Sequence, residues 1–192
     1  MSFSLNEVEA TAKRAARGAE YSWGMAEEAA KAVRWLCAND MDGVHELAKL
    51  LERDAEDQAA CPLRIGTQIT DNAANLTQGS MDFPEVARPA LVLPFLAFAA
   101  RQVDLCLSLT SNGQTAKTDG HALSSPNEMT SPGQSLVIGV CDTVDSPREV
   151  ASRATPIPED WATLNRWAHL TYAPATEESR LLGAGAGLSD ND

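Results

Sequence analysis

Apolar residues recur at helical spacing in the first third of the chain, and this pattern predicts three amphipathic helices. Ser4, followed three residues later by Glu7, has the pattern of a capping box at the start of the first helix. Asp42 is a suitable N-cap for the third. The predicted helices cover residues 5–17, residues 25–38, and the stretch from Asp42 to about Arg53. Residues 1–56 are therefore expected to form a compact helical unit.

The pattern changes twice in the middle of the chain. Residues 57–88 are polar and poor in periodicity apart from one short strand predicted at 63–69, so they are expected to be a loop-rich connector. Residues 89–145 are expected to form a sheet. Within them, 103–110 alternate apolar with polar positions, which predicts a half-buried strand, and Asn112 with Gly113 predicts a hairpin turn.

Two further segments complete the predicted sheet. Residues 114–118 read as a polar returning strand, and a loop rich in Ser and Pro follows at 124–134. The sequence SLVIGVC at 135–141 is apolar on both faces, which is typical of a central strand covered on its two sides. Helices are then expected to pack on the sheet.

The last predicted helix begins at the sequence PIPEDW and runs to about Tyr172, before Pro174. Helices, then strands, then a helix define an α+β fold, with the sheet antiparallel or mixed. We expect one domain over residues 1–192, in which 146–192 hold the C-terminal helix and a glycine-rich tail.

Composition and charge narrow the class of protein. The chain has 44% hydrophobic and 22% charged residues, as soluble globular proteins do, and a net charge of −12. That charge repels phosphate backbones, so neither nucleic acid nor an anionic membrane is expected as a partner. The apolar run 90–100 is too short to cross a bilayer, and no signal peptide is evident at the N-terminus. A cytoplasmic protein without a cofactor or metal is the expectation.

The four cysteines, at positions 37, 61, 106 and 141, are scattered without close spacing. This spacing indicates neither a disulfide framework nor a zinc site. Reduced thiols in the core are expected.

The tail RLLGAGAGLSDND is the most unusual stretch of the chain, because Gly183, Gly185 and Gly187 alternate with alanine. Fixing ten residues costs about 10–20 kcal/mol of backbone entropy, while burying Leu182 or Leu188 returns only about 1.5–3 kcal/mol each. Either this terminus is frayed, or the glycines let the backbone run through a narrow groove of a partner. Its sequence is neither a dinucleotide fingerprint nor a phosphate loop.

Aromatic side chains mark a second candidate site. Tyr21 and Trp23 lie in the turn EYSWG between the first two predicted helices. They are suited either to stack on a ligand or anchor an interface, or simply to cover the helical core.

The third and fourth candidates are polar. His45, His121 and His169 have no familiar catalytic signature around them, so surface histidines are expected, with His121 able to titrate near neutral pH. The sequence ATEESR at 175–180 offers a group that suits a carboxylate or phosphate, with Glu177 or Glu178 as a base, or else a charged turn. The binding residues predicted there are Thr176, Glu177, Ser179 and Arg180.

The two ends of the chain resemble a bacterial family of about this length whose function is unknown. The resemblance is carried by SLNEVEATAKRAARGAEYSWGMAEEAAKAVRWL at 4–36 and by TYAPATEESRLLGAGAGLSDND at 171–192. It implies a single domain across the whole chain and a tail that the family shares. It brings no activity, cofactor or catalytic residue.

A fainter similarity links residues 24–47 to the N-terminal helices of malate/lactate dehydrogenases of the non-Rossmann type. In that family a Ser-His-Gly motif follows the second helix. Gly43, Val44, His45 and Glu46 stand here instead, and the chain is too short for that family's cofactor domain. The activity is therefore not expected.

Two functions are predicted from these features. The first is a non-catalytic binding or accessory subunit of bacterial small-molecule metabolism, in a homo- or hetero-oligomer whose tail docks onto a partner or neighbouring subunit. The second is a small enzyme for a carboxylated or amino-acid-like metabolite, with its site near residues 176–192 and proton exchange at Glu177 or His121. A purely structural domain with a loose tail is the third alternative.

Overall fold

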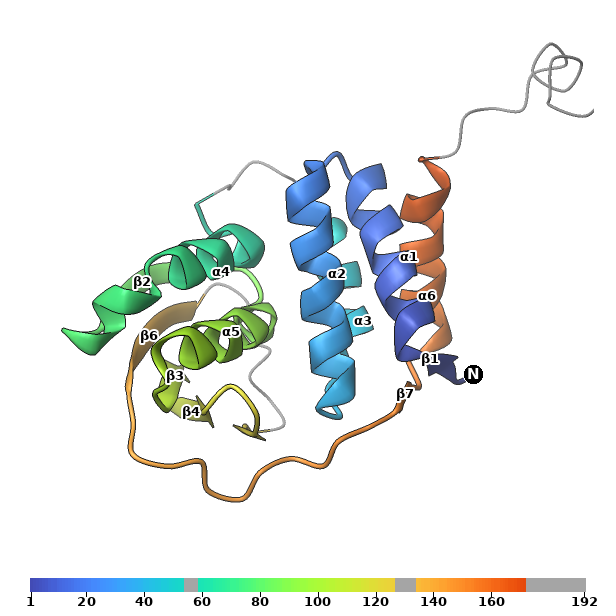
Figure 1. Cartoon of the computed structure of the whole chain (residues 1–192). Coiled ribbons are helices and arrows are strands. Elements are labelled where there is room, and N and C mark those ends of the chain that lie inside the picture. The colour runs from blue at the N-terminus through green and yellow to red at the C-terminus, as the bar shows by residue number, and fades with distance from the viewer. Residues whose placement is uncertain (54–58, 127–133, 172–192) are drawn as a thin grey trace, which may run out of the picture.

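The computed structural model describes residues 1–53, 59–126 and 134–171 (Figure 1). The tail and the predicted site residues Thr176, Glu177, Ser179, Arg180, Gly183, Gly185 and Gly187 lie outside the described residues. So does Glu178.

Four helices form a bundle on one side of the molecule (Figure 1). They are α1 (Leu5–Gly18), α2 (Trp23–Ala38), α3 (Gly43–Leu51) and the C-terminal α6 (Pro158–His169). The capping box between Ser4 and Glu7 is confirmed, as is the cap on α3, where the Asp42 carboxylate accepts from the His45 N–H at 3.0 Å. These capping groups mark where the helices begin, because they accept hydrogen bonds from backbone N–H groups of the first turn, which have no carbonyl partner within the helix.

The C-terminal helix closes the bundle by packing against α1 and α3. A proline at its first turn starts α6, as predicted. Just before it, β7 (Arg153–Ala154) pairs antiparallel with β1 (Phe3–Ser4), so the segment that leads into α6 is held against the N-terminus. Phe3 also stacks on Trp161 with ring centroids 3.9 Å apart.

The predicted strand at 63–69 is wrong: this segment is part of helix α4 (Pro62–Asp71). Pro62 sits in the first helical turn, and Leu63, Gly66 and Ile69 share a buried face at helical spacing. A Cβ on Gly66 would lie 2.2 Å from the Phe95 ring, so this helix packs closely on the next one. The 3-10 helix η1 (Ala73–Thr77) and β2 (Met81–Val86) complete the segment that was expected to be rich in loops.

The sheet does not begin at residue 89 as predicted. Pro89–Val92 form the 3-10 helix η2, and Leu93–Val103 form helix α5, with Pro94 in its first turn. A continuous apolar run cannot be assigned to strand or helix by periodicity alone, because both are found fully buried. Phe95 and Leu96 of α5 are 0% exposed, and α5 contacts both α2 and the sheet, so it joins the two halves of the core.

Five strands form an antiparallel sheet. The predicted hairpin is confirmed, with Asn112 and Gly113 at positive φ between its strands. The predicted strand at 103–110 starts later, because α5 continues to Val103 and Asp104 ends it in the left-handed region. Besides β2, this sheet contains β3 (Leu107–Ser111), β4 (Gln114–Thr118), β5 (Leu123–Ser124) and β6 (Gln134–Val140). The order of the strands across the sheet is β2-β6-β3-β4-β5.

The prediction that SLVIGVC is covered on both faces is also wrong. β6 lies between β2 and β3, but its burial alternates: Leu136 and Ile138 are fully buried, whereas Val137 is 43% exposed. Helix α5 packs on the face that carries Leu107 and Leu109. The other face, which carries Val137, faces solvent. An antiparallel sheet with one solvated face is common.

The arrangement confirms the predicted α+β class. None of the helices in the described ranges combines the length and the apolar character needed to cross a membrane.

Candidate functional site

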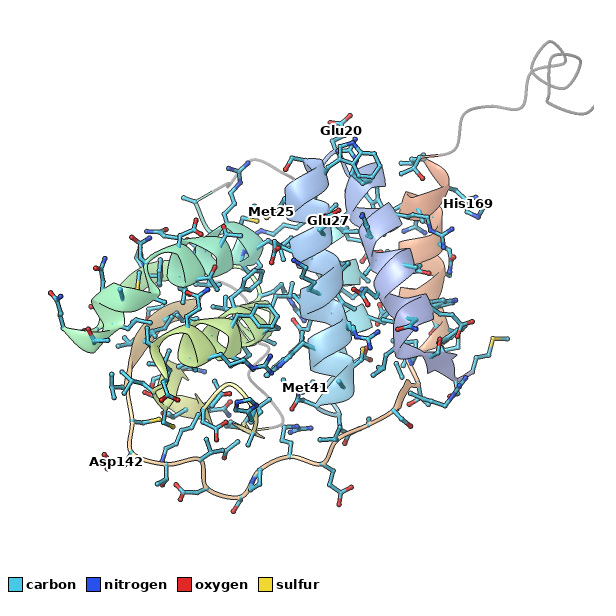
Figure 2. The ribbon with its side chains drawn as sticks, viewed as in Figure 1. Glu20, Met25, Glu27, Met41, Asp142 and His169 are labelled. Carbon is cyan, nitrogen blue, oxygen red and sulfur yellow. The ribbon has the colours of Figure 1, made fainter. Side chains whose placement is uncertain are left out.

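The end of the bundle where α1 passes into α2 carries the most exposed tryptophan of the described chain. Ser22 caps α2 by accepting the Met25 N–H at 3.3 Å, so Trp23 is the first residue of the helix and not part of the preceding turn. Its side chain is 66% exposed. Glu20, labelled in Figure 2, marks this end of the molecule.

Two cations hold the Trp23 ring in place. The Arg17 guanidinium lies 4.6 Å from the ring centroid, and the Lys13 Nζ lies 5.9 Å from it. Arg17 also donates to the backbone oxygen of Tyr21, and Lys13 pairs with Glu27 at 2.7 Å. Each such cation–π contact is worth about 0.5–1 kcal/mol at an exposed site. The indole is therefore both accessible and preorganised.

A second exposed apolar side chain lies at the same end of the bundle. Leu170, at the end of α6, is 65% exposed. A Cβ built on Gly18 would lie 3.4 Å from the Leu170 Cβ, so the end of α6 contacts the end of α1 directly. We call Arg17, Gly18, Trp23 and Leu170 the helix-end surface. The chain continues into residues 172–192 from Thr171, next to this surface.

Tyr21 has a different role from Trp23. Its ring packs against the core, and its hydroxyl lies 3.7 Å from the Cys61 Sγ. Burial, with a smaller contribution from Cys61, raises the pKa of the Tyr21 phenol. Of the two predicted aromatic residues, Trp23 faces solvent and Tyr21 mainly covers the core.

A histidine–carboxylate pair, which the sequence did not predict, joins α3 to α6. The His45 Nδ1 lies 2.7 Å from the Asp160 Oδ2, and the Asp160 side chain is only 3% exposed while that of His45 is 35% exposed. The Lys49 Nζ is 3.8 Å from the other Asp160 oxygen. A buried carboxylate that accepts the Nδ1–H of a histidine fixes the orientation of the ring, an arrangement that is also found in proton-transfer sites.

The next residue along α3 forms the most buried ion pair described. Glu46 accepts two hydrogen bonds from the Arg88 guanidinium, at 2.7 and 2.8 Å, and the two side chains are 5% and 12% exposed. Desolvation raises the pKa of Glu46, although the Arg88 charge and hydrogen bonds oppose this shift. This pair ties α3 to the segment before η2.

The other predicted histidines lie apart from these groups. His121 is exposed in a turn. The Asp119 carboxylate accepts the backbone N–H groups of Ala122 and His121, each at 2.8 Å, and these two bonds lower the pKa of Asp119. His169 lies in the last turn of α6, on the outer side of that helix (Figure 2). The C-terminal end of a helix favours positively charged side chains. The structure therefore brings neither of them to His45.

A small polar cavity lies at the opposite end of the bundle, near Met41 (Figure 2). Its volume is about 180 Å³, and Asp40, Asp42 and Arg153 line it. Small-molecule sites have volumes of about 300–1,000 Å³. Within the described ranges, no three His, Cys, Asp or Glu side chains are grouped so that they could hold a metal ion.

Comparison with known proteins agrees with the predicted resemblance at the N-terminal end. Residues 3–76 match the family described as Protein of unknown function (DUF3726). That match spans α1 to α4 and most of η1, which includes Trp23 and His45, and it does not reach the tail. No curated protein matches the chain, and no solved structure matches it.

Proposed function

We propose that the protein is a non-catalytic binding or accessory subunit of bacterial small-molecule metabolism, and that the helix-end surface is its contact with a neighbouring protein subunit. The observation that carries this proposal is the exposed Trp23, held by Arg17 and Lys13. Trp and Arg are enriched among the few residues that supply most of the binding energy at protein interfaces, and a side chain that is fixed before binding loses less entropy.

Charge indicates what kind of surface this subunit contacts. Lys13, Arg14 and Arg17 lie within one stretch of five residues in a chain whose net charge is −12. We therefore propose a protein partner that presents carboxylates around an apolar pocket for the indole. A second copy of this acidic chain supplies carboxylates, as does a different acidic subunit, so the proposed complex is a homo- or hetero-oligomer.

The glycine-rich tail is part of the same proposal. Residues 172–192 continue from Thr171, which follows Leu170 of the helix-end surface. Gly183, Gly185 and Gly187 have no side chain to keep the backbone away from a groove. In this proposal the segment 182–192 docks onto the subunit that also receives Trp23.

Replacing Trp23 with alanine is the first test. We expect the affinity for the neighbouring subunit to fall at least about 30-fold, because interface tryptophans typically contribute 2 kcal/mol or more. Native mass spectrometry of the full-length protein and of its co-purified complex, over a concentration series, measures this loss. The control is Val150→Ala, since Val150 is 83% exposed and lies outside the helix-end surface.

Deleting residues 182–192 from the otherwise complete chain should weaken the same complex. Unchanged assembly in both the Trp23→Ala protein and the shortened protein would contradict the proposal. Loss in the Trp23 variant alone would confine the contact to the helices.

The second candidate function, a small enzyme acting on a carboxylated or amino-acid-like metabolite, is favoured by one observation, the pair between His45 and the buried Asp160. In this alternative the His45 Nε2 exchanges the proton, in place of His121 or Glu177. Arg180, Thr176 and Ser179 would still bind the substrate carboxylate.

This alternative predicts that His45→Gln lowers turnover by about 10²–10⁴-fold without unfolding the protein. A panel of amino and hydroxy acids, followed by mass spectrometry, provides the assay. His169→Gln, on the outer side of α6, is the matched control. Equal turnover of the two variants would remove His45 from the chemistry.

A further inference from the structure

Cys106 and Cys141 lie directly opposite each other at one end of the sheet. Cys106 precedes β3, Cys141 follows β6, and the register pairs the neighbouring residues Leu107 and Val140. The Cys141 N–H donates to the Cys106 oxygen at 2.9 Å. Opposite residues of antiparallel strands have Cα atoms about 4.5–5.5 Å apart, within the range that a disulfide spans.

The side chains of these two cysteines are in contact. Their Sγ atoms are 2.7 Å apart, close enough to share a thiol hydrogen, and both residues are half-buried. All four cysteines are free, as expected, but only Cys37 and Cys61 are buried in the core, whereas Cys106 and Cys141 are partly exposed. Two cysteines 35 positions apart in the chain were brought together by the strand register, which their spacing does not reveal.

One cation and one carboxylate lie beside the pair. Lys117 is opposite Ser108 on the neighbouring strand, and its ammonium interacts electrostatically with both thiols. The Lys117 Nζ also bonds to the Asp145 Oδ2 at 2.9 Å. Asp142, labelled in Figure 2, shows where the chain leaves β6 just after Cys141.

The two sulfurs are not equivalent. Burial, followed by the hydrogen bond and electrostatic repulsion from Cys106, raises the pKa of Cys141 to about 12, and Lys117 opposes this rise. A thiolate is the attacking species in thiol chemistry, so the raised pKa of Cys141 disfavours this sulfur as the first to attack.

We propose that Cys106 and Cys141 are a redox site that forms a reversible disulfide, with a low-molecular-weight disulfide as the oxidant. Cys106 loses its proton to water and attacks one sulfur of the oxidant, whose S–S bond breaks and releases one thiolate. Cys141 then loses its proton and attacks the Cys106 sulfur, which releases the second thiolate. The two cysteines lose two electrons, the oxidant gains them, and the two thiolates take up the two protons.

The disulfide joins the start of β3 to the end of β6 and closes a loop that contains β4 and β5. Closing a loop of this length restricts the unfolded chain. We expect the oxidised protein to melt about 5–10 °C higher than the reduced protein.

The test equilibrates the full-length protein with defined ratios of glutathione and glutathione disulfide, then alkylates free thiols and maps peptides by mass spectrometry. We expect one linked peptide, Cys106 to Cys141, with the loss of two hydrogen masses, and its yield should follow the ratio reversibly. Cys37 and Cys61 should be alkylated only after denaturation. The measurement on the unaltered protein does not depend on whether any variant folds.

Variants make the test specific. Cys106→Ser and Cys141→Ser should each abolish the internal disulfide and the rise in Tm, whereas Cys37→Ala should retain both. Lys117→Gln should slow disulfide formation about two- to fivefold, the range expected for one partly exposed charge. Mixed disulfides with glutathione without a linked peptide, or links that involve Cys37 or Cys61 equally, would overturn the proposal.

Discussion

Replacing Arg88 with methionine is expected to lower the free energy of unfolding by about 3–5 kcal/mol, the usual cost of leaving one partner of a buried ion pair alone. Glu46 is only 5% exposed and receives both of its charged hydrogen bonds from Arg88. Methionine keeps most of the length of the side chain but donates nothing. Urea unfolding of both proteins at pH 7 measures the difference.

The loss in the free energy of unfolding caused by Arg88→Met should depend on pH. Burial already raises the pKa of Glu46, and removal of the guanidinium removes the groups that oppose this rise. The folded variant then favours a protonated Glu46 more than the unfolded chain does. The loss of stability is therefore largest when the pH is above the pKa of Glu46 in the folded variant, and it becomes smaller as the pH falls toward the pKa of Glu46 in the unfolded chain. The free energies of unfolding of the two proteins should thus differ less at pH 5 than at pH 7.

Two further proteins control this result. Arg166→Met removes an exposed pair with Glu52, at 3.4 Å, and should cost less than about 1 kcal/mol. The double variant Glu46→Met with Arg88→Met should recover most of the loss, because no buried charge is left unpaired. A loss of similar size in the Arg88 and Arg166 variants would show that the buried pair contributes no more than a surface pair.

Replacing Gly18 with alanine is expected to destabilise the protein by about 3 kcal/mol, at the upper end for overpacking. A Cβ at this position would lie 1.8 Å from the Trp167 carbonyl oxygen and 2.7 Å from its carbon. Both atoms are backbone of α6, so relief requires the two helices to separate. Because Gly18 also contacts Leu170, the helix-end surface should change shape.

Gly24→Ala is the matched control, since Gly24 lies in α2 with nothing within 4 Å of the added carbon. Because Gly24 lies in the first turn of the helix, alanine there should stabilise the protein by at most about 0.5–1 kcal/mol through its higher helix propensity. Thermal unfolding of the two variants should therefore give shifts of opposite sign. Stabilisation by Gly18→Ala would mean that α1 and α6 are farther apart than described.

Local signals predicted the bundle well. The Ser4–Glu7 capping box, the Asp42 cap and the proline at the start of α6 act within one helical turn, so neighbouring residues in the sequence are sufficient to reveal them. The hairpin at Asn112–Gly113 is equally local. Within the bundle, the sequence analysis did not identify Ser22 as the cap of α2. The helix therefore begins at Trp23, two residues before the predicted start at residue 25.

The predictions of secondary structure were wrong where packing in the core, rather than the local sequence pattern, determines whether a segment is a helix or a strand and which of its faces are buried. Residues 63–69 and 89–103 are apolar enough for either strand or helix, and the packing of Gly66 on Phe95 favours two helices. SLVIGVC reads as a doubly covered strand, but α5 covers the face opposite Val137.

The sequence by itself determined the α+β class, most of the helix starts in the bundle and the hairpin, because each depends on residues close together in the chain. It also singled out Trp23 as an aromatic candidate, but only the structure showed that this side chain faces solvent. Only the tertiary structure decided which distant side chains meet: His45 with Asp160, Glu46 with Arg88, and Cys106 with Cys141. Such pairs depend on how helices pack and how strands align. Neither the packing of helices nor the alignment of strands can be deduced from the spacing of residues along a single sequence.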